Sequence, residues 1–172
     1  MIGTILERIF GRRTFLAASA SAGLAAALRT TARAQGEEAM LTRKVPRTGE
    51  ALPVIGLGTW QTFDVGPSED ERAPRLEVLK TFLAAGGRVI DSSPMYGRAE
   101  EVTGDLLLRL GGKARPFLAT KVWTNGKASG EGQIRESFRR LRSQVVDLFQ
   151  IHNLLDWETH LGTLRELRSK GQ

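Results

Sequence analysis

The chain contains no cysteine and only two histidines, His152 and His160, among its 172 residues. The absence of cysteine excludes a disulfide framework and a thiol nucleophile. Cysteine usage therefore gives no indication of the redox compartment. Two histidines eight residues apart, without a cysteine, do not form a zinc-binding set, so we expect no metal. A composition of 41% hydrophobic and 26% charged residues is that of an ordinary globular chain, for which one domain is the first expectation.

A basic stripe of the kind that binds nucleic acid is also missing. Most of the formal net charge of +6 lies in the first 34 residues, where five arginines face one glutamate and give +4. The remaining 138 residues carry 20 basic and 18 acidic groups, a net charge of +2. Because no basic stripe with interleaved aromatics remains, we expect no nucleic-acid partner.

Residues 1–34 have the pattern of an export leader. A pair of arginines at residues 12–13 precedes an alanine-rich apolar stretch at residues 15–28, and residues 32–34 read Ala-Arg-Ala, a small-x-small cleavage pattern. The apolar stretch is 14 residues long, shorter than the roughly 20 that a membrane span needs. The paired arginines and mild hydrophobicity resemble a twin-arginine signal peptide. We predict export through the twin-arginine machinery, a mature domain at residues 35–172 in the periplasm, and no stable membrane insertion. The alternative is a basic amphipathic start that stays attached.

Four short apolar runs each end on a polar or aromatic residue. Trp60 follows VIGLGT, Asp91 follows GRVI, Lys121 follows PFLAT and His152 follows DLFQI, at intervals of 31, 30 and 31 residues. This period is about the length of one strand, one helix and their loops, so each repeat is interpreted as a βα unit. In a barrel of such units the carboxyl ends of the strands share the face that carries catalysis. An acid, a base and an imidazole are therefore expected to converge.

Turn and helix signals complete the predicted order of elements. Turn residues in PRTGE predict a hairpin between Leu41–Val45 and Leu52–Val54, before the first repeat. A dinucleotide fingerprint would need a third glycine at Gln61, so a Rossmann fold is rejected. Apolar residues at helical spacing predict four helices, between Pro74 and Gly86, over Val102–Leu110, over Ile134–Leu141, and from about Asp156, as a candidate N-cap, to Gly171.

Each strand-end residue also has a purely structural explanation. Asp91 could close a strand and hold a turn, Tyr96 could be a packed turn aromatic, and His152 could be a hydrogen-bonded structural residue. Lys121 must either extend to solvent or find an anion. We interpret His160, on the last predicted helix, as structural. The joint spacing of the strand ends, and no single residue, favours a functional site.

The segments KVPRTGEALPVIGLGTW, GGRVIDSSPMYGRAEEVTGDLL, FLATKVWT and VDLFQIHNLLDW resemble the amino-terminal half of the aldo-keto reductases, from about Met40 to the end of the chain. The resemblance implies a (β/α)8 TIM-barrel oxidoreductase that uses NADP(H) to reduce aldehydes or ketones, small carbonyl compounds, to alcohols. It implies a catalytic tetrad of Asp91, Tyr96, Lys121 and His152. It places Thr59 and Asp91 at the cofactor, and Trp60, Trp123 and Asn153 at the substrate. Asn153 departs from the tryptophan of several mammalian members, which leaves the substrate class open.

The implied chemistry has a physical logic. Tyr96 would donate the proton to the carbonyl oxygen, and a nearby ammonium from Lys121 would favour its phenolate form. A buried ammonium is costly unless it is paired, so Asp91 would be its counter-ion. His152 would donate a hydrogen bond to the substrate oxygen, while the cofactor would perform the hydride transfer.

The chain ends after the fourth predicted helix, whereas the resemblance implies four further strands that carry most cofactor contacts. We therefore expect a partial barrel, an amino-terminal hairpin followed by about four βα units. Three interpretations stay open: an exported oxidoreductase represented in part, a truncated inactive product or a half-barrel that binds or oligomerises, and a barrel lyase that uses Lys121 as a Schiff base. Pairing with Asp91 argues against the lyase because it keeps the lysine charged. For the 172 residues alone, we expect little NADPH-dependent activity and a tendency to self-associate.

Overall fold

The structure is a computed structural model that describes residues 40–111 and 115–172. The predicted leader, residues 1–34, lies outside the described residues. No helix within the described ranges is long and apolar enough to cross a membrane. The description below therefore concerns the part of the chain in which the repeats and the candidate site residues lie.

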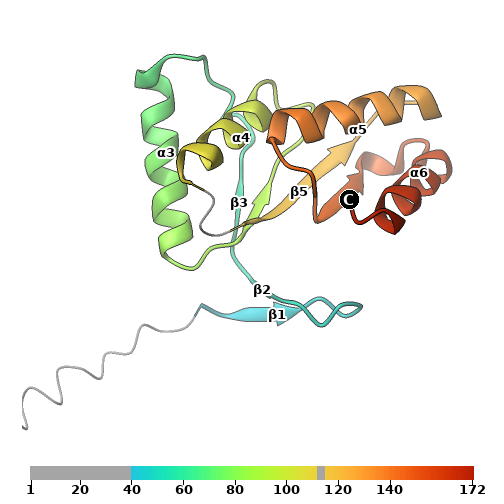
Figure 1. The fold of residues 1–172 in the computed structure, drawn as a ribbon, viewed down its shortest axis with the longest axis horizontal. Helices are drawn as coiled ribbons and strands as arrows, with labels where there is room; N and C mark the ends of the chain where they lie inside the picture. The colour runs from blue at the N-terminus through green and yellow to red at the C-terminus, as the bar shows by residue number, and fades with distance from the viewer. Residues whose placement is uncertain (1–39, 112–114) are drawn as a thin grey trace, which may run out of the picture. The chain divides into compact units, whose positions relative to one another are not determined.

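An antiparallel hairpin precedes the repeats, as predicted. Strand β1 (Thr42–Lys44) pairs with β2 (Ala51–Pro53), with Arg43 opposite Leu52. Gly49, at φ 74°, takes the left-handed conformation in the turn, where a side chain would be unfavourable. Figure 1 shows the hairpin as a separate pair of strands ahead of the main sheet.

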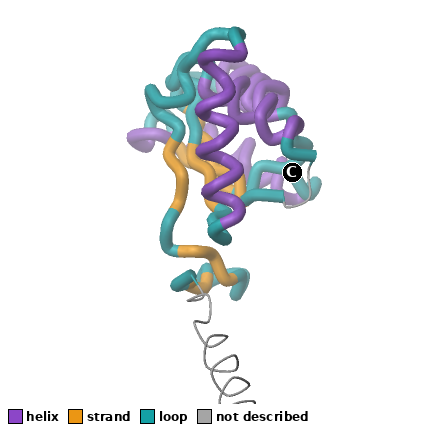
Figure 2. The backbone as a smooth tube through the Cα atoms, turned by 90° about the vertical axis from the view of Figure 1, so that its left-hand side faces the viewer, coloured by secondary structure: helices purple, strands orange, loops and turns teal. Residues whose placement is uncertain are grey.

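Four parallel strands form the sheet, and consecutive strands are neighbours in the order β3-β4-β5-β6. They are β3 (Gly56–Gly58), β4 (Val89–Asp91), β5 (Phe117–Val122) and β6 (Leu148–Ile151). They alternate with four helices, α3 (Glu69–Ala84), α4 (Ala99–Arg109), α5 (Lys127–Leu141) and α6 (Trp157–Ser169). The helices follow one another around the strands in Figures 1 and 2, and each contacts the next. The prediction of a partial barrel of βα units is confirmed.

The first three helices begin further upstream than predicted, whereas the fourth begins where it was predicted. Helix α3 begins at Glu69, because Ser68 accepts a hydrogen bond from the Glu71 N–H and donates to the Glu71 carboxylate at 2.7 Å. Ser68 and Glu71 have the spacing of a capping box, and Pro74 lies inside the helix and does not start it. Asp156 does occupy the N-cap position of α6, but its side chain makes no cap bond there.

Apolar side chains between the helices and the sheet form the core. Its largest fully buried members include Phe63, Leu79, Ile90 and Leu106. Helices α4 and α5 meet closely at Gly104, where an added Cβ would lie 2.7 Å from the carbonyl carbon of Leu141. The lack of a side chain at Gly104 therefore allows α4 and α5 to pack directly against each other.

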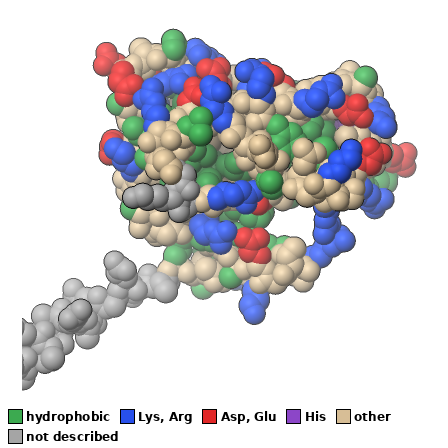
Figure 3. Space-filling model, viewed as in Figure 1, with side chains coloured by type: hydrophobic (Ala, Val, Ile, Leu, Met, Phe, Trp, Pro, Cys, Tyr) green, Lys and Arg blue, Asp and Glu red, His purple; other side chains and the backbone are tan. Residues whose placement is uncertain are grey.

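Charges of both signs are interspersed over the helices on the face drawn in Figure 3. Many are paired, and Arg72 is the most buried of the described arginines. Its guanidinium lies 2.7 Å from the Asp105 carboxylate, 3.3 Å from Glu101 and 3.1 Å from the Gly66 carbonyl. Arg72 thereby ties α3 to α4.

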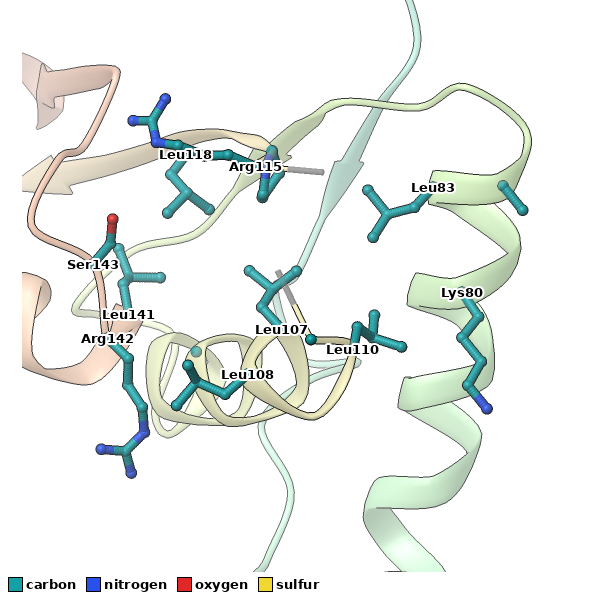
Figure 4. Close-up of a pocket in the computed structure, with 14 residues that line it drawn as sticks. Lys80, Leu83, Leu107, Leu108, Leu110, Arg115, Leu118, Leu141, Arg142 and Ser143 are labelled. Carbon is teal, nitrogen blue, oxygen red and sulfur yellow. The ribbon is translucent and has the colours of Figure 1, made fainter. Parts of the chain in front are cut away.

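An apolar hollow of about 720 Å³ lies between α3, α4 and the segment that leads into β5. Leu83 from α3 and Leu107 from α4 point into it, as Figure 4 shows. Arg115 and Pro116, which precede β5, also line it, so the hollow lies at the amino end of this strand. It is therefore separate from the strand ends at which the predicted site residues lie.

Candidate active site

The predicted strand ends are found where the sequence period places them. Asp91 is the last residue of β4, Lys121 the penultimate residue of β5, and His152 directly follows β6. The register pairs Gly58 with Asp91 and Lys121 with Gln150 across neighbouring strands. Since all four strands are parallel, these residues lie at one edge of the sheet.

A salt bridge joins two of these strand ends. The Lys121 Nζ lies 2.7 Å from Asp91 Oδ2 and 2.8 Å from the carbonyl oxygen of Ser92. The lysine side chain is 9% exposed, whereas that of Asp91 is 37% exposed. The ammonium is thus enclosed, and its counter-ion keeps one side open to water.

Gln150 holds the second oxygen of the same carboxylate, since its Nε2 donates to Asp91 Oδ1 at 2.9 Å. Both Asp91 oxygens therefore have a protein partner. Sequence reasoning missed this residue. The available signal was the period of two along a strand, which places Gln150 on the same side of the chain as His152, two residues later.

Tyr96 lies beside the ammonium. The Lys121 Nζ is 4.9 Å from the centroid of its ring, within the range of a cation–π contact. The Trp60 ring packs against the Tyr96 ring, with 6.2 Å between the two ring centroids and an interplanar angle of 43°. The lysine hydrogen bonds go to Asp91 and Ser92, and the Tyr96 ring is a third neighbour of the ammonium.

His152 is held by a second aromatic contact. The Trp123 ring meets its imidazole edge-on, with centroids 5.5 Å apart and planes at 85°. Asn153, the next residue, takes a left-handed conformation at φ 54° and is exposed. Asparagine is one of the few residues that adopt this conformation readily. The structure thus brings Asp91, Tyr96 and Lys121 into one cluster, and His152 into a second cluster with Trp123.

The residues predicted to meet ligands differ in exposure. Trp60 is 62% exposed and Trp123 44%, so both rings can contact a bound molecule. Thr59 is fully buried, and its hydroxyl contacts the Asp91 carbonyl at 3.1 Å and the Ser92 hydroxyl at 2.9 Å. Thr59 thereby fixes the end of β4, while the surface at this edge comes from Trp60 and Asp91.

A carboxylate, an ammonium and a phenol ring lie together at the carboxyl ends of the strands, and the His152 imidazole follows the neighbouring strand β6. Phenol and imidazole can each donate a hydrogen bond to an oxygen that gains negative charge. Within residues 40–111 and 115–172, no group of three or more histidine and acidic side chains could hold a metal ion.

Comparisons with known proteins agree with this architecture. The profile of the Aldo/keto reductase family matches residues 54–172. Among curated relatives, the methylglyoxal reductase YeaE of Escherichia coli is 33% identical over 106 residues, which are 59% of this chain and 36% of the relative. The aldo-keto reductase YhdN of Bacillus subtilis is 28% identical over 140 residues, 73% of this chain and 42% of the relative. The chain thus spans about two fifths or less of the curated relatives it matches.

Solved structures give the same result. The thermostable aldo-keto reductase Tm1743, crystallised with the inhibitor epalrestat, superposes with a TM-score of 0.66 and 29% identity over 77% of this chain and 51% of its own. An aldo-keto reductase from Klebsiella pneumoniae in complex with NADPH superposes with a TM-score of 0.59 and 29% identity, over 74% of this chain and 47% of its own.

Proposed function

The chain belongs to the aldo/keto reductase family, and from this premise we propose that it supplies the proton-transfer groups of an NADP(H)-dependent reductase that converts aldehydes or ketones to alcohols. One observation carries the proposal. An enclosed ammonium, that of Lys121, lies between the carboxylate of Asp91 and the ring of Tyr96.

Each residue has a defined task in this reaction. Tyr96 donates a proton to the carbonyl oxygen, and the Lys121 ammonium stabilises the phenolate that remains. Asp91 keeps the ammonium in place, and Gln150 fixes the orientation of Asp91. His152 donates a hydrogen bond to the substrate oxygen and sets its direction.

NADP(H) is the proposed cofactor, and it supplies the hydride when bound. The Klebsiella pneumoniae relative that contains NADPH supports this choice. The open edge at Trp60 and Asp91 fits a flat, polar nicotinamide ring, because it combines an exposed aromatic surface with a carboxylate. Asp91 would contact this ring. Thr59 would act by holding the end of β4, since its own hydroxyl is buried and bonded.

The test uses the enzyme expressed from its full open reading frame. Tyr96→Phe should lower kcat with methylglyoxal or another small aldehyde on the order of 10²–10⁴-fold, while NADPH binding, followed by nucleotide fluorescence, stays nearly unchanged. Lys121→Met should be similarly damaging, and the double variant should be no worse than either single one, because both residues serve one proton transfer. Wild-type turnover in either variant would contradict the assignment of Tyr96 and Lys121 to proton transfer. Trapping of a carbonyl substrate on Lys121 by borohydride would favour the lyase alternative.

We further propose that the protein is exported to the periplasm by the twin-arginine route. The arginine pair at residues 12–13 and the apolar stretch at residues 15–28 support this proposal. The route carries folded proteins, so NADP(H) can be bound before export. Replacement of both arginines by lysine should retain the protein in the cytoplasmic fraction. Normal accumulation of that variant in the periplasm would contradict the proposal.

A further inference from the structure

A buried histidine that the proposed reaction does not use lies on α6. His160 is fully buried, and its Nε2 lies 2.7 Å from the carbonyl oxygen of Thr124, in the loop that follows β5. A carbonyl oxygen only accepts, so Nε2 must carry the proton and donate. The other ring nitrogen, Nδ1, has no hydrogen-bond partner among the described residues. The Nε2 proton of the ring is therefore directed at the loop.

The imidazole occupies a space that exists because α5 has a glycine at that point. A Cβ added at Gly130 would lie 2.5 Å from Nδ1 of His160, closer than real side-chain contacts allow. The Cε1–Nδ1 edge of the ring thus lies directly against Gly130 of α5. Helix α5, helix α6 and the loop after β5 meet at this one side chain.

Two more bonds fix the same loop. The Asp156 carboxylate accepts from the Gly126 N–H at 2.7 Å, a bond that lowers the pKa of this carboxyl below its usual range. The Gln133 side chain accepts from the Trp123 N–H at 2.6 Å. Trp123, Thr124 and Gly126 are thus each held by a side chain from α5 or from α6 and its N-cap. The loop is attached to its flanking helices along its length.

We propose that His160 is a positioning residue of the active site. It holds the Thr124 carbonyl and thereby sets the loop so that Trp123 packs edge-on against His152, 5.5 Å between ring centroids. The indole then forms a fixed wall beside the imidazole, and the imidazole is held in one orientation. The consequence for carbonyl reduction rests on the proposed function, whereas the positioning itself does not.

The experiment follows the His152 imidazole by proton NMR in the full chain. Residues 1–172 contain two histidines, so in a protein of these residues a variant at His160 leaves one imidazole signal, that of His152. The Trp123 ring current displaces this signal, and Trp123→Leu gives its position without the indole. The matched variants are His160→Gln, whose amide nitrogen falls where Nε2 lies, and His160→Asn, whose amide nitrogen falls where Nδ1 lies.

We expect His160→Gln to keep the displaced His152 signal, and His160→Asn to move it toward the Trp123→Leu position. A wild-type signal in His160→Asn would overturn the proposal. Loss of the displacement in both variants would also overturn it, because the shape of the ring and not its N–H would then matter.

A second pair of variants decides the matter if His160→Asn does not fold. Gly130→Ala places a methyl group against the imidazole, whereas at Gly132→Ala, in the same helix, the nearest atom lies 3.9 Å away on Arg135. Both changes favour the helix by about 1 kcal/mol. Gly130→Ala should shift both imidazole signals and Gly132→Ala neither. An unshifted His152 signal in Gly130→Ala would refute the positioning role, whether or not the protein reduces carbonyl compounds.

Discussion

The salt bridge between Lys121 and Asp91 is asymmetric, and the two ends should respond differently to mutation. Removal of one partner from a buried pair typically costs about 3–5 kcal/mol, because a charge stays buried without compensation. Asp91→Asn leaves the 9% exposed Lys121 ammonium in that state. Water at the 37% exposed Asp91 position reduces the cost, so we expect a loss of about 2 kcal/mol in the free energy of unfolding.

The change at the other end should cost less. Lys121→Met keeps most of the buried volume and removes the enclosed charge, while the Asp91 carboxylate stays in contact with water and with Gln150. We expect a loss of less than about 1 kcal/mol, because an apolar replacement of a buried ion is often close to neutral. For the same reason, Lys121→Met added to Asp91→Asn should recover much of the stability that Asp91→Asn loses.

Urea unfolding at pH 7, followed by tryptophan fluorescence, gives the free energy of unfolding of the wild type, the two single variants and the double variant of this cycle. The slope of the free energy with urea must agree among them for the comparison to hold. A larger loss for Lys121→Met than for Asp91→Asn would refute the reasoning. So would additive losses in the double variant, because the two side chains would then not interact.

Two further predictions concern α4. Burial raises the pKa of the Glu100 carboxyl above its usual value of 4.5. The contribution of this group to the free energy of unfolding is therefore fully present below pH 4.5 and is lost as the pH rises above that value. Glu100→Gln should therefore gain stability relative to the wild type in urea titrations as the pH rises above 4.5, and a relative loss would contradict this. Gly104→Ala should cost about 1–3 kcal/mol in the same assay, because its Cβ would overlap the α5 backbone. Gly162→Ala, with nothing within 4 Å, is the control and should be neutral or slightly stabilising.

The strand positions were predictable because the signal for them is local. Each apolar run is short, is bounded by turn residues and recurs at nearly the length of a βα unit, so strand type, order and parallel direction follow together. The sequence also placed Asp91 and Lys121 on neighbouring strands, where opposite charges at the same edge can meet. Sequence spacing could not supply the orientation of side chains within that edge.

The features that were missed depend on contacts between elements distant in sequence. Gln150 is an ordinary strand residue until the fold brings Asp91 next to it, 59 residues earlier in the chain. The bond from His160 to Thr124 spans 36 residues. The start of α3 is a different case, because Ser68 and Glu71 form a local capping box that Pro74 obscured. The spacing of Ser68 and Glu71 is the stronger local signal for a helix start, and the position of Pro74 is the weaker one.

The register of strand β5 links the polar core to the site. Thr120 directs its hydroxyl to the buried Glu100 carboxyl on α4, at 2.7 Å, while Lys121 extends to the opposite side of the strand and reaches Asp91. Successive residues of a strand point to opposite faces, so both contacts can form only in one register. A slip of one residue would turn the ammonium toward the helices and leave Glu100 facing it. The buried Glu100–Thr120 bond is therefore consistent only with the register in which Lys121 meets Tyr96, and it links a polar residue in the helix layer to the proposed site.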